Sequence, residues 1–173
     1  MDFSQNYFEI FQLSVSFDLD TEDLSKRYRS LQSRLHPDKF VDATDHEKRL
    51  SLQWATRVNA AYQIISSDLS RAIYLLELKG VLIQENPKLP KNFLIEQIER
   101  REELDKILED GCSMELLAAF KGEIDKCTAD YLAEFSEIYL TNLRDAEIVV
   151  YKLQFFNKLS LQVNKIEDKI LGY

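Results

Sequence analysis

The sequence DTEDLSKRYRSLQSRLHPDKF, residues 20–40, combines a helical pattern with an abrupt stop. Asp20, followed three residues later by Asp23, resembles the capping arrangement of a helix N-terminus. The apolar positions that follow recur at helical spacing: Leu24, Tyr28, Leu31 and Leu35. Pro37 excludes the residue before it from the α region, so the pattern predicts a helix from about residue 20 to residue 35.

A second, longer helix follows the proline. Thr44 and Glu47 form a capping-box pattern, and helical spacing continues through the apolar residues Leu50, Trp54, Val58, Ala61, Tyr62 and Ile65. The tripeptide His36-Pro37-Asp38 therefore lies in a loop between two amphipathic helices. We expect these helices to be an antiparallel pair.

Helical patterns also fill the rest of the chain. The apolar segment from Tyr7 to Leu13 predicts a short helix, and another short helix follows residue 68 and ends at Gly80. Residues 81–91 contain two of the three prolines, as a linker does. Three further helices are predicted at about 92–110, 113–139 and 143–170. We expect an all-α protein with a four-helix unit at 1–80, a linker at 81–91 and a three-helix bundle at 92–173.

Composition supports long helices. The chain has 173 residues, 45% of them hydrophobic and 30% charged, which is enough for a core and argues against global disorder. Four Gly and three Pro are too few for the turns of a many-stranded fold. The formal net charge of -8 disfavours binding of a nucleic-acid backbone as the main activity.

The cysteines and the N-terminus indicate the compartment. Cys112 and Cys127 are the only cysteines, and their spacing fits neither a zinc knuckle nor a disulfide framework. We expect two free thiols in a reducing compartment. No apolar run is long enough to span a bilayer, and the first residues lack signal-peptide and transit-peptide character. These features predict a soluble, intracellular protein without a membrane partner.

The tripeptide itself has two chemical interpretations. Pro37 suits a chain reversal, and Asp38 can hydrogen-bond nearby backbone in the turn. A His beside an Asp is also compatible with acid–base catalysis or metal binding. However, His46 is the only other histidine, and no third ligand or nucleophile stands at a recognisable spacing. We expect no catalytic residue, no metal and no cofactor. A metal-dependent hydrolase using His36, Asp38 and His46 stays as an alternative, which a metal analysis tests.

Three segments together resemble a J-domain: NYFEIFQL at 6–13, YRSLQSRLHPDKF at 28–40 and NAAYQII at 59–65. The resemblance implies that the N-terminal unit binds an Hsp70-type chaperone and stimulates its ATPase, while the chain itself is no enzyme. By the same resemblance, the chaperone-binding residues are His36, Pro37 and Asp38, supported by Tyr28, Arg29 and Lys39.

Basic side chains surround this tripeptide: Lys26, Arg27, Arg29, Arg34 and Lys39. Such a stripe would steer encounter with an acidic partner, although a solvated helix face is the alternative. The chain departs from many J-domains in having Gln12 where they have Gly. Ser25 and Ser30 also interrupt the basic run, which suggests a specialised Hsp70.

The whole chain resembles the HscB family of iron–sulfur cluster co-chaperones, through RAIYLLEL at 71–78, NFLIEQIERREEL at 92–104 and KLQFFNKL at 152–159. The resemblance implies that the bundle binds an iron–sulfur scaffold protein of the IscU type and that the chain delivers it to an Hsp70 of the HscA type, in a bacterial cytoplasm. The scaffold-binding residues that it implies are Leu94, Ile95, Ile98, Glu99, Glu102 and Phe155.

Helix geometry supports this surface separately. At about 100° per residue, one side of the helix at 92–110 collects a predicted core stripe, made of Phe93, Leu104, Ile107 and Leu108. Leu94, Ile95 and Ile98 fall on another side. Phe155 likewise lies beside the predicted buried seam of the last helix, which comprises Val149, Leu153, Phe156, Val163, Ile166 and Ile170. Spacing alone does not separate a partner surface from a wide core stripe. A different client, or dimerisation of the bundle, also stays open.

Overall fold

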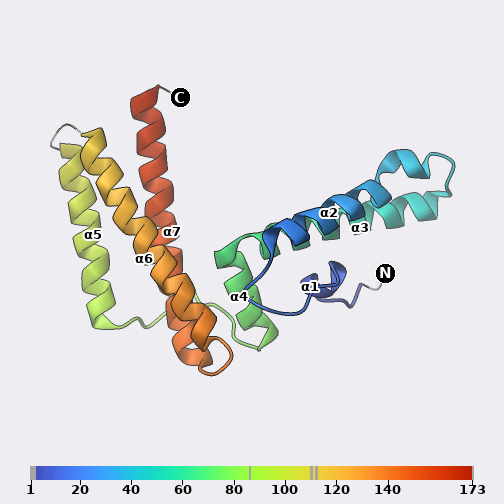
Figure 1. The fold of residues 1–173 in the computed structure, drawn as a ribbon, viewed down its shortest axis with the longest axis horizontal. Helices are drawn as coiled ribbons and strands as arrows, with labels where there is room; N and C mark the ends of the chain where they lie inside the picture. The colour runs from blue at the N-terminus through green and yellow to red at the C-terminus, as the bar shows by residue number, and fades with distance from the viewer. Residues whose placement is uncertain (1–2, 86, 110, 112, 173) are drawn as a thin grey trace. The chain divides into compact units, whose positions relative to one another are not determined.

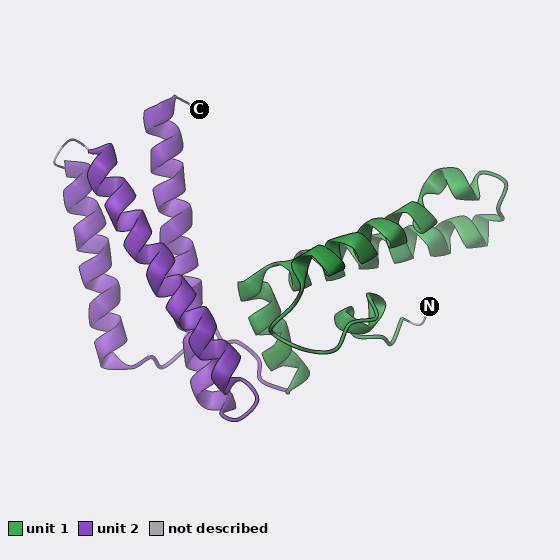
Figure 2. Cartoon of the chain, in the orientation of Figure 1, with its two compact units in different colours: residues 1–79 green, residues 80–173 purple. Residues whose placement is uncertain are grey.

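The computed structural model describes residues 3–85, 87–109, 111 and 113–172, and every regular element in this part of the chain is helical (Figure 1). The predicted all-α fold is therefore confirmed. The helices divide into two compact units, residues 1–79 and 80–173 (Figure 2).

The first unit is built around a helical hairpin. It contains α1 (Tyr7–Ile10), α2 (Thr21–Leu35), the 3-10 turn η1 (Pro37–Phe40), α3 (Asp45–Ser66) and α4 (Asp68–Leu78). α2 and α3 run side by side in opposite directions, and both α1 and α4 pack against α3 (Figure 1).

The two hairpin helices begin where their capping residues predict. The Asp20 carboxylate accepts the backbone N–H groups of Glu22 and Asp23 at 2.9 and 3.0 Å. Thr44 Oγ1 accepts the N–H of Glu47, whose carboxylate accepts the Thr44 N–H at 2.8 Å. These side chains supply partners for N–H groups that the first helical turn leaves open.

The first helix is shorter than predicted, because it ends at Ile10 and does not reach Leu13. Gln12 has a φ of +55°, and it is the only non-glycine residue with a positive φ in the described part of the chain. A left-handed residue cannot continue a right-handed helix. This is also the position where many J-domains have Gly, which adopts such a φ without steric cost.

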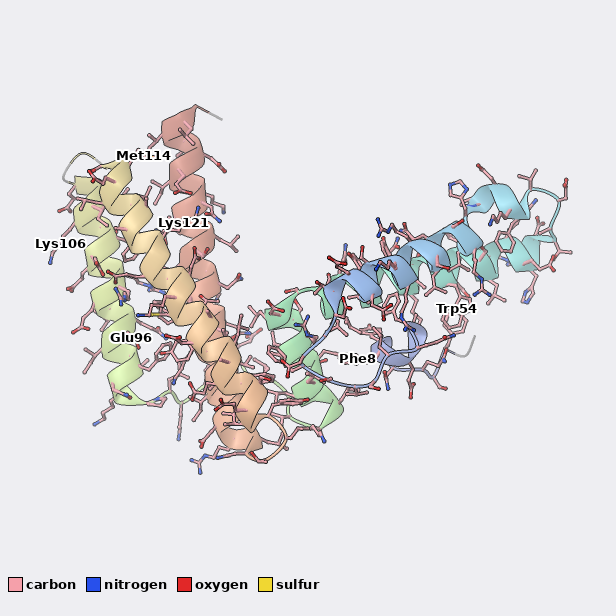
Figure 3. All side chains as sticks on the ribbon, viewed as in Figure 1. Phe8, Trp54, Glu96, Lys106, Met114 and Lys121 are labelled. Carbon is pink, nitrogen blue, oxygen red and sulfur yellow. The ribbon has the colours of Figure 1, made fainter. Side chains whose placement is uncertain are left out.

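An aromatic stack and a buried arginine connect the segments outside the hairpin to the rest of the first unit. Trp54 lies on α3 (Figure 3). Its ring stacks on Phe3 of the N-terminal segment at 4.2 Å between ring centroids. The buried Arg71 of α4 donates to the carbonyl oxygens of Phe17 and Ile65 at 2.8 and 2.6 Å. A buried guanidinium needs such acceptors, and here they attach α4 to the segment between α1 and α2 and to the last turn of α3.

The second unit is a three-helix bundle of α5 (Lys91–Glu109), α6 (Met114–Ile138) and α7 (Leu143–Leu171), which lie side by side in Figure 1. Asn142 caps α7 by accepting the Asp145 N–H, and Gly172 ends it at a φ of 81°. The core cluster is composed of Phe93, Leu104, Ile107, Leu117, Phe120, Ile124, Phe155, Phe156, Leu159 and Val163.

Two residues predicted in this core are exposed. Leu108 lies in the last turn of α5 and Ile170 in the last turn of α7, where the bundle gives less cover than in the middle of each helix. Cys127 is a free thiol, half-buried against the core, whereas Cys112 lies outside the described residues.

The expected linker segment contacts the bundle. The Gln84 N–H donates to the Tyr151 hydroxyl at 2.7 Å, and Leu89 packs against the core of the second unit. The Pro90 carbonyl accepts the N–H groups of Phe93 and Leu94 at the start of α5. The described residues of this segment are thus non-helical and pack against the helices of the second unit.

Candidate functional site

The His-Pro-Asp tripeptide forms an exposed turn at the end of α2. Leu35 is the last residue of the helix, His36 is extended, and Pro37 starts the turn η1, which needs no N–H at that position. His36 Nδ1 accepts the Asp38 N–H at 3.3 Å. The side chains of His36 and Asp38 are 59% and 85% exposed, so the turn presents an imidazole and a carboxylate to solvent.

Tyr28 joins the two hairpin helices behind this turn. Its ring stacks on Tyr62 of α3 at 3.9 Å, and its hydroxyl donates to Asn59 Oδ1 at 3.2 Å. Gln32 also donates to Asn59 Oδ1, at 3.0 Å. A groove of about 330 Å³ lies beside these residues and brings Arg29 together with His36 and Pro37. Lys39 is exposed on η1.

The basic stripe is narrower than the sequence suggests. Arg27 pairs with Asp23 at 2.8 Å and donates to the carbonyl oxygens of Phe11 and Gln12. It therefore joins the loop after α1 to α2, and part of its charge is neutralised by Asp23. Within the described residues, the exposed side chains of Arg29, Arg34 and Lys39 have no acidic group within 4.0 Å. These three can still attract an acidic surface.

The apolar patch on α5 is exposed as expected. Leu94, Ile95 and Ile98 are 44%, 56% and 58% exposed, and Glu99 and Glu102 are exposed beside them. We call these five residues the α5 patch. The other side of the helix buries Phe93, Leu104 and Ile107 in the bundle core. α5 thus has a buried apolar side and a separate exposed one, so Leu94, Ile95 and Ile98 are not part of a wide core stripe.

Phe155 corrects the sequence prediction. It belongs to the bundle core at 7% exposure and does not stand beside the buried seam. Its ring meets Phe93 of α5 edge-to-face at 5.8 Å and Phe156 at 5.2 Å. The predicted buried seam of α7 describes the side of α7 that one neighbouring helix covers. Phe155 lies on another side of α7, which α5 covers through Phe93.

Two arginines that sequence reasoning did not single out hold α5 in place. Arg100 forms ion pairs with Glu103 at 3.0 Å and with Glu123 of α6 at 2.6 Å. Burial lowers the pKa of Arg100, but its bonds to these carboxylates outweigh burial and raise the pKa. The Arg101 guanidinium lies over the Phe155 ring at 5.7 Å. Only the charge pattern of α5 hinted at these residues, since the contacts that join them to α6 and α7, with Glu123 and Phe155, are distant in sequence.

The described part of the chain has neither a cluster of metal-binding side chains nor a helix suited to span a membrane. No group of three or more His, Cys, Asp or Glu side chains there is arranged to hold a metal ion. In the same residues, no helix has both the length and the apolar character needed to cross a membrane.

Comparison with known proteins decides the family. A family model described as "DnaJ domain" matches residues 6–74, and one described as "HSCB C-terminal oligomerisation domain" matches residues 89–164. The co-chaperone protein HscB homolog of Vibrio cholerae strain M66-2 is 35% identical over 170 residues, covering 96% of this chain and 99% of that protein. The chain belongs to the HscB co-chaperone family.

Other members of the HscB family match over the same extent. The HscB homolog of Shewanella loihica is 37% identical over 171 residues, covering 95% of this chain and 99% of its own length. The structure of chaperone HscB from Vibrio cholerae matches with a TM-score of 0.86 at 35% identity, covering 96% of this chain and 99% of that one. The crystal structure of human co-chaperone protein HscB matches with a TM-score of 0.91 at 27% identity, covering 96% and 84%. The predicted family is confirmed, with the tripeptide turn and the α5 patch inside the two matched regions.

Proposed function

We propose that this HscB-family chain is an adaptor with two working surfaces. One end engages a specialised Hsp70 of the HscA type, and the other holds an iron–sulfur scaffold protein of the IscU type. Membership of the HscB family supports a co-chaperone role in iron–sulfur cluster assembly. The observation that carries the adaptor is the presence, on two separate compact units, of an exposed His-Pro-Asp turn and an exposed apolar helix side.

The Hsp70-facing residues are His36, Pro37 and Asp38, with Tyr28, Arg29 and Lys39 in supporting roles. The tripeptide contributes a carboxylate and an imidazole on a short turn. Arg29 and Lys39 add positive charge next to it, which favours an acidic partner surface. Tyr28 is held by Tyr62 and Asn59, so it orients α2 more than it offers free area.

The scaffold-facing residues are those of the α5 patch. Leu94, Ile95 and Ile98 supply apolar area that a partner can remove from water. Glu99 and Glu102 border this area and favour a basic patch on the scaffold. Phe155 supports α5 from beneath through Phe93, and this gives it a positioning role in scaffold binding.

The chain carries out no bond chemistry in this proposal. It stimulates ATP hydrolysis by its Hsp70 partner, whose conformational cycle then acts on the scaffold. We place this role in a bacterial cytoplasm, since the HscB homologs of Vibrio and Shewanella are 35% and 37% identical to this chain, against 27% for the human protein.

The decisive experiment measures Hsp70 ATPase turnover with and without scaffold protein, using wild type and His36→Gln. His36→Gln should abolish the stimulation while calorimetric scaffold binding stays unchanged. His46→Gln is the matched control, because His46 is exposed on the first turn of α3 and lies outside the tripeptide. Full stimulation by His36→Gln would contradict the Hsp70 assignment. Absence of scaffold binding by wild type would contradict the other half of the adaptor.

Self-association is a second candidate for the bundle, because the family model that matches residues 89–164 is described as an oligomerisation domain. Sedimentation velocity of the chain, alone and with scaffold protein, separates the two. Dimers that dissociate as scaffold is added would place both interactions on the same surface.

A further inference from the structure

Ser51 is a buried polar residue next to the tripeptide turn. It lies on α3 at 6% exposure, and its hydroxyl donates to the backbone carbonyl of Leu35 at 3.1 Å. Leu35 is the last residue of α2 and the immediate neighbour of His36. This single bond therefore joins α3 to the backbone from which the turn begins.

The Leu35 carbonyl has no suitable donor in its own chain segment. The last carbonyl groups of a helix lack intrahelical partners. Pro37 has no N–H, the Asp38 N–H goes to His36 Nδ1, and the Lys39 N–H goes to the His36 carbonyl at 3.0 Å. A buried carbonyl without a partner is costly, so the Ser51 hydroxyl satisfies a need that the turn creates.

The other polar ties between α2 and α3 are further from the turn and more exposed. Tyr28 and Gln32 both hydrogen-bond to Asn59, and those bonds are exposed to solvent. None of the residues of η1, Pro37–Phe40, is buried. The turn is thus ordered by its own short-range bonds, by the contacts of η1 with α3 and by the Ser51–Leu35 bond at its base.

We infer that Ser51 is a positioning residue for the His-Pro-Asp turn, and that its hydroxyl increases the fraction of molecules whose turn is ready to bind Hsp70. The inference rests on the proposed Hsp70 function. When a partner binds only one conformer, the apparent dissociation constant equals the intrinsic constant divided by the fraction of molecules in that conformer. Losing the hydroxyl therefore raises the concentration needed for half-maximal ATPase stimulation and leaves the maximal rate unchanged.

The test compares Ser51→Thr with Ser51→Val, because these side chains have the same shape and differ in the hydroxyl. Ser51 lines a groove of about 330 Å³ with Pro37 and Leu52, which leaves room for the added methyl group. Ser51→Thr should behave as wild type. Ser51→Val should need more protein for half-maximal stimulation, up to roughly fivefold for one lost hydrogen bond, with the full factor where the ready turn is the minor conformer in wild type. Amide chemical shifts of His36 and Lys39 should move in Ser51→Val only.

Thr56→Val is the matched control. Thr56 lies on the same helix and donates to the Leu52 carbonyl at 3.0 Å, but this bond is exposed and stays within α3. It should change neither the half-maximal concentration nor the shifts of the turn. All titrations are run at a temperature below the thermal unfolding transition of every variant. If Ser51→Val does not fold, Ser51→Ala replaces it as the variant without a hydroxyl.

Two results would overturn the inference: equal half-maximal concentrations for Ser51→Thr and Ser51→Val, or a lower maximal rate without a change in that concentration. Failure of the proposed function itself is seen separately, as stimulation that survives His36→Gln.

Discussion

The two working surfaces of this protein are built in opposite ways. The His-Pro-Asp turn is polar and consists of consecutive residues, with bonds within a few positions of the chain and one further bond from Ser51 at its base. The α5 patch is apolar and spread along a helix, and its exposure depends on which side of α5 the bundle buries. The shape of the turn is therefore mainly local in origin, with one tertiary support from α3, whereas the patch is a product of tertiary packing.

The supports of the two surfaces differ accordingly. Behind the turn, α2 and α3 are joined by side-chain hydrogen bonds and the Tyr28–Tyr62 stack. Beneath the patch, α5 buries only three described residues in its helix, Phe93, Leu104 and Ile107, and is held further by Arg100. We expect substitutions under the patch to cost stability and substitutions at the patch to cost binding.

The largest effect should come from Phe155→Ala. This ring is buried between Phe93 and Phe156, so its removal leaves a cavity and should lower the free energy of unfolding of the second unit by about 3–5 kcal/mol. Ile98→Ala is the control, because an exposed side chain should change stability by less than about 0.5 kcal/mol. Denaturant unfolding followed by circular dichroism measures both.

The single tryptophan makes this experiment specific. Trp54 lies in the first unit, so its fluorescence reports that unit alone. Phe155→Ala should leave the fluorescence transition in place and shift the dichroism of the bundle. A variant of wild-type stability that nevertheless loses scaffold binding would show that the Phe155 ring is itself a contact.

The next effect tests the patch directly. Replacing Leu94, Ile95 and Ile98 together by Ala should weaken scaffold binding by about 2 kcal/mol or more, roughly thirtyfold in the dissociation constant, if they form a hot spot. Both unfolding transitions should stay close to wild type, since all three side chains are exposed. Isothermal titration calorimetry with scaffold protein measures the affinity.

The matched control for the patch is Leu116→Ala with Leu161→Ala. Both residues are exposed apolar side chains of the same unit, on α6 and α7. Equal weakening by the control would indicate that exposed apolar area in general, and not the α5 patch, drives the interaction.

Sequence alone predicted the local surface better than the packed one. Asp20, Thr44 and Pro37 set the limits of α2 and α3 through short-range chemistry, and the structure agrees with them. Phe155 was placed wrongly, because its burial depends on α5, which is distant in sequence. Ser51 gave no signal at all, since a serine in a helix reveals its role only through the Leu35 carbonyl of another helix.

Gln12 allows a smaller test, confined to the first unit. Its φ of +55° is unfavourable for a residue with a Cβ. Gln12→Gly should raise the stability of this unit by about 0.5–1 kcal/mol, because relief of that conformation outweighs the added freedom of the unfolded chain. Gln12→Ala keeps the Cβ and should show no gain. Trp54 fluorescence during denaturant unfolding measures both, and a destabilised glycine variant would contradict the expectation.

The smallest effect concerns acid at the start of α3, near the tripeptide turn. The backbone N–H of Thr44, and then its hydroxyl, lower the pKa of Glu47 from its ordinary value of 4.5. A carboxylate whose pKa is lowered in the folded state stabilises that state at a pH above its ordinary pKa of 4.5. This contribution is lost as the pH falls through the lowered pKa of the folded state. The Trp54 unfolding midpoint of wild type should therefore fall more on acidification than that of Glu47→Gln, whose cap does not titrate. Parallel pH profiles for the two proteins would show that ionisation of Glu47 adds nothing measurable to the stability of the first unit, and that the acid sensitivity of this unit has another source.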